Sequence, residues 1–88
     1  MEQEFDRVAK LLKQHMHQFT DDQKLHMYGL YKQSKEGDIP DNYTCNDMYS
    51  NFKKKAWEKN KGMKQEDAMQ TYINIAYKFE KLKNKKTA

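Results

Sequence analysis

The stretch "MYGLYKQ" places two phenols and an ammonium group at neighbouring positions. Tyr31 and Lys32 follow Tyr28 by three and four residues, so on a helix the three side chains share one patch. Lys24 and Lys35 extend this patch by one turn in each direction. Aromatic faces stack on planar bases, and phenols and lysines bind phosphate oxygens, so the patch fits a nucleotide. The alternative is a core edge whose tyrosine hydroxyls and lysines reach water.

A second cluster of basic and aromatic residues occurs in "NFKKKAWEKNKG". Lys53 and Trp57 are four residues apart, and Lys53 borders an apolar stripe that contains Phe52. Such a lysine either leans over the rim of a pocket or belongs to a solvated run beside a buried tryptophan. We expect Lys54 and Lys55 to be solvated.

The 88 residues suit one domain, 1–88, with a lysine-rich C-terminal tail at about 84–88. The 17 basic residues exceed the 13 acidic ones by only four, and Arg7 is the single arginine. This mild excess is compatible with nucleic acid, an anionic lipid surface or a phosphorylated small molecule. Charge alone does not choose among them.

The single cysteine, Cys45, excludes an internal disulfide, and no partner lies at a zinc-binding spacing from it. We therefore expect no metal and no cofactor. The charged N-terminus has no apolar leader segment, and no run approaches the roughly 18 apolar residues of a membrane span. The sequence favours a soluble cytosolic or nuclear protein without stable membrane insertion.

Hydrophobic residues at helical spacing predict helices over 3–16, 21–36, about 48–59 and 64–83. Thr20 and Gln23 form a capping-box pattern before the second helix. The predicted apolar faces are Phe5, Val8, Ala9, Leu12 and Met16; Tyr49, Phe52 and Ala56; and Ala68, Met69, Tyr72, Ile75, Ala76, Phe79 and Leu82. No alternating strand pattern occurs, so we predict an all-α four-helix bundle with a long connection between the second and third helices.

Three segments resemble the acyl-CoA-binding protein family in order and spacing: "FDRVAKLLK", "LHMYGLYKQSKEGD" and "KKKAWEKNKGMKQEDAMQTYI". The resemblance covers almost the whole chain. Its most specific residues are Tyr28, Tyr31, Lys32, Gln33, Gly37, Ala56, Trp57, Gly62, Glu66, Asp67, Ala68 and Tyr72. The resemblance implies an up-down-down-up bundle and non-catalytic, intracellular transport of medium- to long-chain acyl-CoA esters.

The resemblance also implies a set of ligand-binding residues. Tyr28, Lys32 and Lys53 are expected to hold the 3'-phosphate of coenzyme A. Tyr31 is expected at the adenine region, and Tyr72 in the lining of the site. The remaining expected contacts are Lys13 and the acyl-chain residues Ala9, Leu25, Met27 and Phe52. The implied carrier is a cytoplasmic monomer that serves acyl-CoA-using enzymes.

The chain departs from the family pattern at several positions. Phe19 stands where a proline is usual, and we expect it to act as a hydrophobic staple for the second helix. Lys35 and Lys54 add charge beside the expected site, and Phe52 replaces a small residue near the acyl channel. The fourth helix lacks a Ser or Thr cap, so Glu66 and Asp67 are expected to serve its dipole.

Other functions fit the sequence less well. His15, His17, His26 and Cys45 do not lie at spacings that would support catalysis. A DNA-binding domain of the HMG-box type is the main alternative, because a tryptophan-bearing helix precedes a long basic one. The mild charge and interrupting acidic residues weigh against nucleic acid as a partner. A helical interaction module without a small ligand would leave the tyrosine–lysine patch unexplained.

Overall fold

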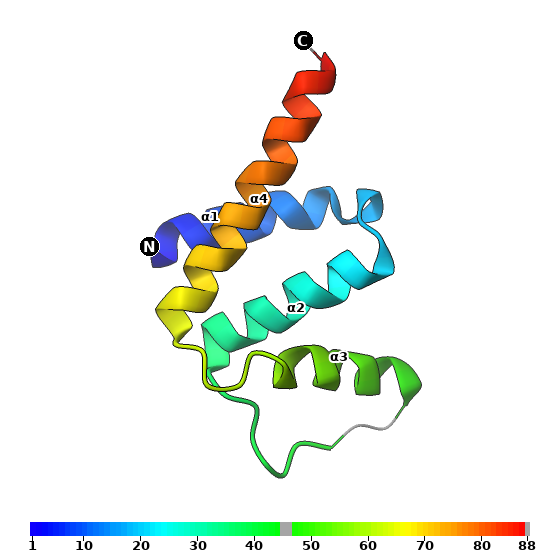
Figure 1. The fold of residues 1–88 in the computed structure, drawn as a ribbon, viewed down its shortest axis with the longest axis vertical. Helices are drawn as coiled ribbons and strands as arrows, with labels where there is room; N and C mark the ends of the chain where they lie inside the picture. The colour runs from blue at the N-terminus through cyan, green and yellow to red at the C-terminus, as the bar shows by residue number, and fades with distance from the viewer. Residues whose placement is uncertain (45–46, 88) are drawn as a thin grey trace.

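The computed structural model describes residues 1–44 and 47–87, with side chains as far as Phe79. Within these ranges the chain forms helices and no strand, which confirms the all-α prediction. The elements are α1 (Glu2–Gln14), the 3-10 helix η1 (Met16–Gln18), α2 (Asp21–Glu36), α3 (Met48–Glu58) and α4 (Gln65–Thr87). Figure 1 shows α2 between α3 on one side and α1 and α4 on the other.

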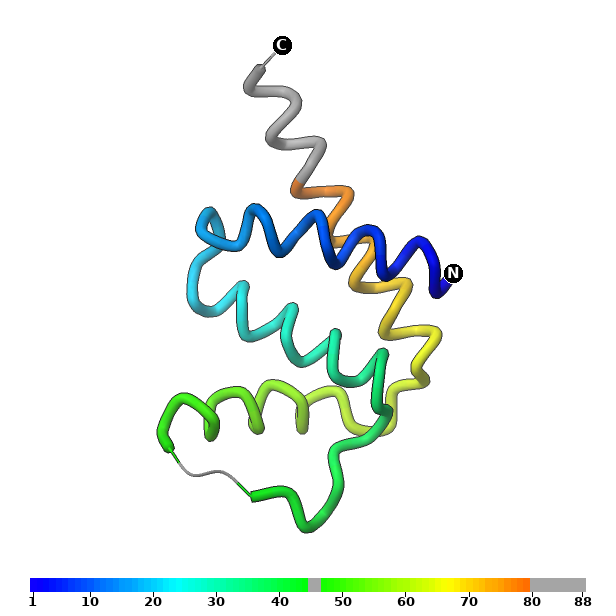
Figure 2. The backbone as a smooth tube through the Cα atoms, turned by 180° about the vertical axis from the view of Figure 1, so that it is seen from behind, coloured from blue at the N-terminus to red at the C-terminus, as the bar shows by residue number. Residues whose placement is uncertain are grey.

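The helices follow the up-down-down-up order. In Figures 1 and 2, α2 runs back against the direction of α1, and α3 runs in the same direction as α2. The long connection from Gly37 to Asp47 carries the chain back across the molecule and makes this parallel pair possible. Helix α4 then returns and packs against both α1 and α2.

The turn between α1 and α2 differs from the prediction. Helix α1 ends at Gln14 rather than at 16, and the chain tightens into η1 before it reverses. The capping box of Thr20 is present, since its hydroxyl accepts from the Gln23 backbone N–H and its own N–H donates to Gln23 Oε1. The predicted staple is not formed, because the fourth residue of α2 is Lys24. Phe19 packs instead edge-on against Phe79 of α4, with 4.5 Å between ring centroids.

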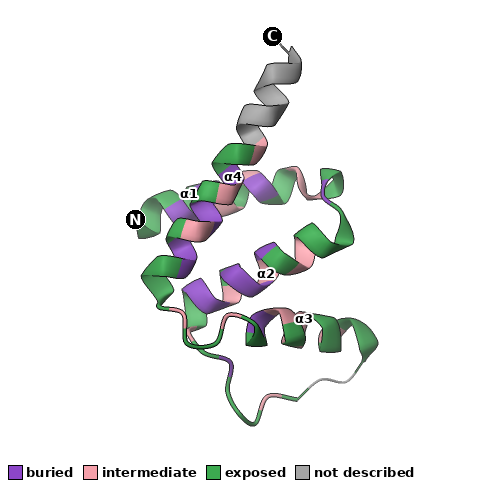
Figure 3. Cartoon of the chain, in the orientation of Figure 1, coloured by how far each residue is buried: buried purple, intermediate pink, exposed green. Residues whose placement is uncertain are grey.

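The hydrophobic core lies where α1, α2 and α4 meet (Figure 3). The predicted stripe of α1 is buried at its main positions, and Ala9 and Met16 pack at its edge. On α4 the prediction missed Ile73, which is buried beside Tyr72. The buried core residues are Phe5, Val8, Leu12, Phe19, Met27, Leu30, Ala68, Met69, Tyr72, Ile73 and Ala76.

The predicted face of α3 is wrong for Tyr49 and Phe52, whereas Ala56 packs against α2. Tyr49 and Phe52 are 59% and 49% exposed, whereas Trp57 is only 1% exposed. The reason is the close approach of α2, because a Cβ on Gly29 would lie 2.3 Å from the Ala56 carbonyl oxygen. This contact turns the side of α3 that carries Ala56 and Trp57 inward. The indole N–H of Trp57 then donates to the Gly37 carbonyl at 2.9 Å.

Helix α4 begins close to its predicted start and ends later than predicted. Glu66 and Asp67 occupy its first turn as expected, where their negative charge favours the helix dipole. The helix continues to Thr87, beyond the predicted end at 83. The Leu82 side chain lies outside the described residues.

Candidate functional site

The tyrosine–lysine patch lies on one face of α2, as the spacing predicted. Tyr28 and Lys32 are partly buried, and Tyr31 is 37% exposed. The Lys32 ammonium lies 4.9 Å from the ring centroid of Trp57 on α3 and pairs with Glu36 one turn further along α2. The lysine is therefore held in place by an aromatic face and a carboxylate before any ligand arrives.

Helix α3 brings Lys53 to the same place. Its ammonium lies 5.2 Å from the ring centroid of Tyr28 and 4.7 Å from that of Tyr49. This position depends on the close packing of Gly29 against Ala56, three residues after Lys53. A backbone contact between two helices thus sets the distance between the two basic groups and the phenol.

These residues border a cavity of about 760 Å³ between α1, α2, α3 and α4. Of the residues proposed from the sequence, Leu25 and Phe52 lie outside its lining. The lining consists of Asp6, Ala9, Lys10, Lys13, Met16, Met27, Tyr28, Tyr31, Lys32, Lys35, Lys53 and Tyr72. Residues from every helix therefore meet at one opening, and among the described lining residues the lysines outnumber the one carboxylate, Asp6.

Aromatic packing beneath the cavity fixes the tyrosine rings. Phe5 stacks against Tyr31 with ring centroids 5.7 Å apart and an angle of 25° between the planes. Phe5 also meets Tyr72 edge-on at 5.0 Å. Because Phe5 is fully buried, Tyr31 is a rigid platform at the cavity wall rather than a mobile surface ring.

Two carboxylates balance part of the positive charge. Lys35 donates to Asp6 at 3.0 Å, and this hydrogen bond raises the pKa of Lys35. Burial lowers the pKa of Lys32, but the hydrogen bond and charge of Glu36 outweigh this effect and leave it raised. Both lysines are therefore cationic at neutral pH.

The phenols of Tyr28 and Tyr72 are neutral at physiological pH. Burial raises the pKa of Tyr28 despite the opposing charge of Lys32. Burial likewise raises the pKa of Tyr72 to about 12, with a smaller contribution from Tyr31. Neutral phenols keep their O–H donors, so Tyr28 can donate a hydrogen bond to an anion at the opening.

Lys10, Met16 and Asp6 line this site but were not predicted from the sequence, and Lys35 was predicted only as a neighbour of the site. One signal was available: Asp6, Lys10 and Lys13 recur at three- and four-residue spacing on the side of α1 next to Ala9. Without the position of α2, that side is indistinguishable from a solvated charged face.

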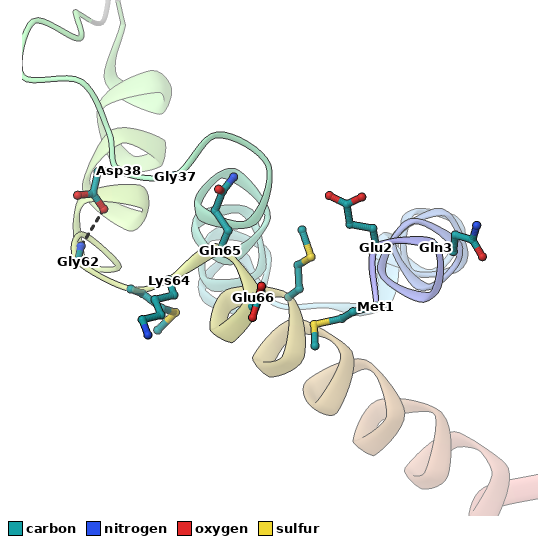
Figure 4. Close-up of a pocket in the computed structure, with 11 residues that line it drawn as sticks. Met1, Glu2, Gln3, Gly37, Asp38, Gly62, Lys64, Gln65 and Glu66 are labelled. Carbon is teal, nitrogen blue, oxygen red and sulfur yellow. Dashed lines mark hydrogen bonds between the residues drawn. The ribbon is translucent and has the colours of Figure 1, made fainter.

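A second and larger cavity, about 1220 Å³, lies at the other end of the bundle (Figure 4). Its wall is formed by the start of α1, the residues after α2 and the start of α4. Asp38 Oδ1 there accepts from the Gly62 N–H and from Gln33 Nε2, both at 2.8 Å, which ties two loops together. Its charged side chains are Glu2, Asp38, Lys64 and Glu66, and none of the predicted ligand residues line it.

The cavity on the α2–α3 side can bind a planar group and an anion together, through fixed rings and paired cations. Among the described residues, no three histidine, aspartate or glutamate side chains gather as a metal site requires. None of the described helices is both long and apolar enough to cross a membrane. Cys45, considered above as a reactive group, lies outside the described residues.

Comparison with known proteins leads to the same ligand chemistry. A family model described as "Acyl CoA binding protein" matches residues 2–76. "Diazepam-binding inhibitor-like 5" of Mus musculus is 38% identical over 86 residues, which cover 93% of this chain and 92% of that protein. The Rattus norvegicus protein of the same name is 38% identical over 88 residues, covering 96% and 94%. These comparisons give no support to the DNA-binding alternative. The chain belongs to the acyl-CoA-binding protein family.

Proposed function

We propose that this protein is a non-catalytic carrier that binds medium- to long-chain acyl-CoA esters reversibly in the cavity between α1, α2, α3 and α4. The observation that carries the proposal is the joint position of Lys32 and Lys53 beside Tyr28, at the opening of a cavity with rigid aromatic walls. A nucleotide phosphate requires paired cations, and its base requires a flat apolar partner.

The 3'-phosphate of coenzyme A is bound by Lys32, Lys53 and the Tyr28 hydroxyl. Both ammonium groups already lie over aromatic rings, so little side-chain entropy is lost when they take up the phosphate. Because the lysine ammonium is a point charge with rotatable donors, Lys32 and Lys53 can adjust their positions to the phosphate during binding. Glu36 is displaced from Lys32 in this step or shares it with the phosphate.

The adenine lies against Tyr31, whose ring is held by Phe5 and Tyr72. Lys13 and Lys10 on α1 face the same cavity and neutralise the remaining phosphates of the ligand. Lys35 is tied to Asp6 and adds positive charge at the edge. These contacts to the adenine and the phosphates make the binding specific for the nucleotide end of the ligand.

The acyl chain follows the apolar part of the lining, where Ala9, Met16 and Met27 lie. Each buried methylene contributes about 0.8 kcal/mol, so a long chain supplies much of the affinity. Leu25 is half-buried and Phe52 half-exposed, and both lie outside the cavity lining, so the proposed path does not pass them. Methionine side chains adapt to different chain lengths.

Reversible sequestration protects the ester from water and delivers it to acyl-CoA-using enzymes. We propose that the carrier is a monomer, because the apolar faces of α1, α2 and α4 are buried in one shared core. We also propose that it is cytoplasmic. No cofactor or metal takes part in this binding step.

Isothermal titration calorimetry tests the proposal with four ligands: a long-chain acyl-CoA, a medium-chain acyl-CoA, the matching free fatty acid and a short DNA duplex. The expected result is one-to-one binding of the acyl-CoA esters with weak signals for fatty acid and DNA. Salt-sensitive DNA binding without acyl-CoA binding would overturn it. Equal affinity for the fatty acid and its CoA ester would remove the role of the nucleotide end.

A further inference from the structure

The first turns of α3 expose three large apolar side chains. Met48 is 76%, Tyr49 59% and Phe52 49% exposed. Phe52 follows the other two by four and three residues, so the three share one side of the helix, which is called here the α3 face. Figure 3 shows this end of α3 coloured as exposed, and the close contact with α2 lies further along the helix, at Ala56. Grouped exposed apolar side chains of this kind mark interaction sites.

Positive charge borders the α3 face. Lys53 follows Tyr49 by four residues and Lys55 follows Phe52 by three, so both border the face, and the first turn of α3 contains no acidic residue. The N-cap carboxylate of Asp47 accepts the Ser50 backbone N–H at 2.7 Å, so that charge is engaged with the helix end. The Lys53 ammonium lies over the Tyr49 ring at 4.7 Å, which brings cation and apolar surface into direct contact.

This combination fits an anionic lipid surface better than a protein. Stable protein interfaces involve roughly 20–30 residues per partner and are depleted in lysine. A second copy of this chain would bring two lysine runs together. At a bilayer, in contrast, Phe and Met side chains enter the acyl boundary, Tyr lies at headgroup level and lysines attract anionic headgroups.

We propose that the α3 face docks this protein peripherally on membranes that contain anionic phospholipids. The position of the α3 face relates the docking to ligand transfer. Lys53 also lies over Tyr28, which lines the acyl-CoA cavity, so the docked surface adjoins the opening. An acyl-CoA ester that leaves the bilayer would meet the cavity without crossing bulk water. This transfer of acyl-CoA rests on the proposed function, but the docking itself does not.

Vesicle sedimentation of the whole protein tests the docking, without added acyl-CoA. Vesicles of phosphatidylcholine alone are compared with vesicles of equal parts phosphatidylcholine and phosphatidylserine, at low and high salt. The expected result is binding to the mixed vesicles only, weakened by salt. Each lysine near the surface adds about fivefold, so the Lys55→Gln variant, which removes a lysine that borders the face, should bind the mixed vesicles about fivefold less.

The apolar contribution is tested by a Met48→Ser, Phe52→Ser double variant, which should lower vesicle binding by about tenfold or more. Matched controls are Tyr77→Ser and the Lys64→Gln, Lys78→Gln double variant, at exposed positions elsewhere, which should stay within about twofold. Circular dichroism verifies the fold of each variant.

Unchanged vesicle binding in the Met48→Ser, Phe52→Ser variant would overturn the proposal, as would equal binding to neutral vesicles. A dimer on size exclusion that this variant abolishes, without vesicle binding by the wild type, would instead assign the face to a second copy. Calorimetry with acyl-CoA separates the two proposals. If the Met48→Ser, Phe52→Ser variant loses vesicle binding and keeps its acyl-CoA affinity, the docking proposal is supported. If the wild type binds acyl-CoA but does not bind vesicles, the docking proposal is wrong and the proposed carrier function stands.

Discussion

The Lys53 ammonium on α3 lies 5.2 Å from the ring centroid of Tyr28 on α2. The two residues are 25 positions apart in sequence, and only the packing of α2 against α3 brings them together. A cation held over a phenol ring keeps its charge available on the opening side of the ring. The phosphate site proposed here therefore depends on an interhelical contact and not on one helix alone.

Tyr28 and Lys32 should contribute unequally to ligand affinity. Lys32→Ala removes a charged partner of the phosphate and should weaken acyl-CoA binding by about 1.5–3 kcal/mol. Tyr28→Phe deletes one hydroxyl and keeps the aromatic face, so its loss should be smaller. Calorimetric titration of both variants checks the order, and a larger loss for Tyr28→Phe would show that the phenol dominates.

Gly29→Ala should destabilise the fold through the α2–α3 contact. The added Cβ would lie 2.3 Å from the Ala56 carbonyl oxygen, so the helices must separate. Overpacking of this kind costs about 1–3 kcal/mol, even though alanine favours a helix. Urea unfolding followed by the fluorescence of Trp57 measures the loss. An Asn51→Ala control at an exposed position of α3 should change stability little; a stable Gly29→Ala variant would mean that the helices can move apart freely.

Glu36→Gln should strengthen acyl-CoA binding slightly. Glu36 pairs with Lys32 and competes with the phosphate for the same ammonium group. Such an exposed pair is worth about 0.3–0.5 kcal/mol, which corresponds to roughly a twofold gain in affinity. Titration of the variant at low salt checks this value. Weaker binding in the variant would show that Glu36 positions Lys32 for the ligand.

Acid should destabilise the protein partly through Asp38 and Asp47. Hydrogen bonds from the Gly62 N–H and Gln33 lower the pKa of Asp38 below its ordinary 3.8, and those of Ser50 lower the pKa of Asp47. The folded state therefore binds these protons less readily than the unfolded state. The stabilisation is complete above pH 3.8 and is lost as the pH falls through the lower folded value. Urea midpoints measured across this range should depend less on pH in Asp38→Asn and Asp47→Asn; an unchanged slope would show that these bonds are not coupled to folding.

Local signals were enough to predict much of this molecule. The Thr20 capping-box pattern predicted the start of α2, and Gly37 is the C-cap at its end. Within that helix, three- and four-residue spacing alone placed Tyr28, Tyr31 and Lys32 on one patch. These features depend on residues that are close together in the chain, so they can be predicted from the sequence alone.

The face of α3 could not be predicted in the same way. Both of its sides carry aromatic residues, so Phe52 and Trp57 were equally suitable for the interior by their chemistry. Gly29, on a different helix, decides between them by admitting the Ala56 backbone. The expected acyl-chain positions Leu25 and Phe52 do not line the cavity, whose walls depend on how all the helices pack.

The most direct test of the phosphate site is a titration of the wild type and Lys53→Ala with a long-chain acyl-CoA and with its 3'-dephospho form. If Lys53 binds the 3'-phosphate, the substitution costs about 1.5–3 kcal/mol against the intact ligand and far less against the dephospho ligand. An equal loss against both ligands would contradict the assignment, because the lysine would then act on some other part of the ligand or on the fold.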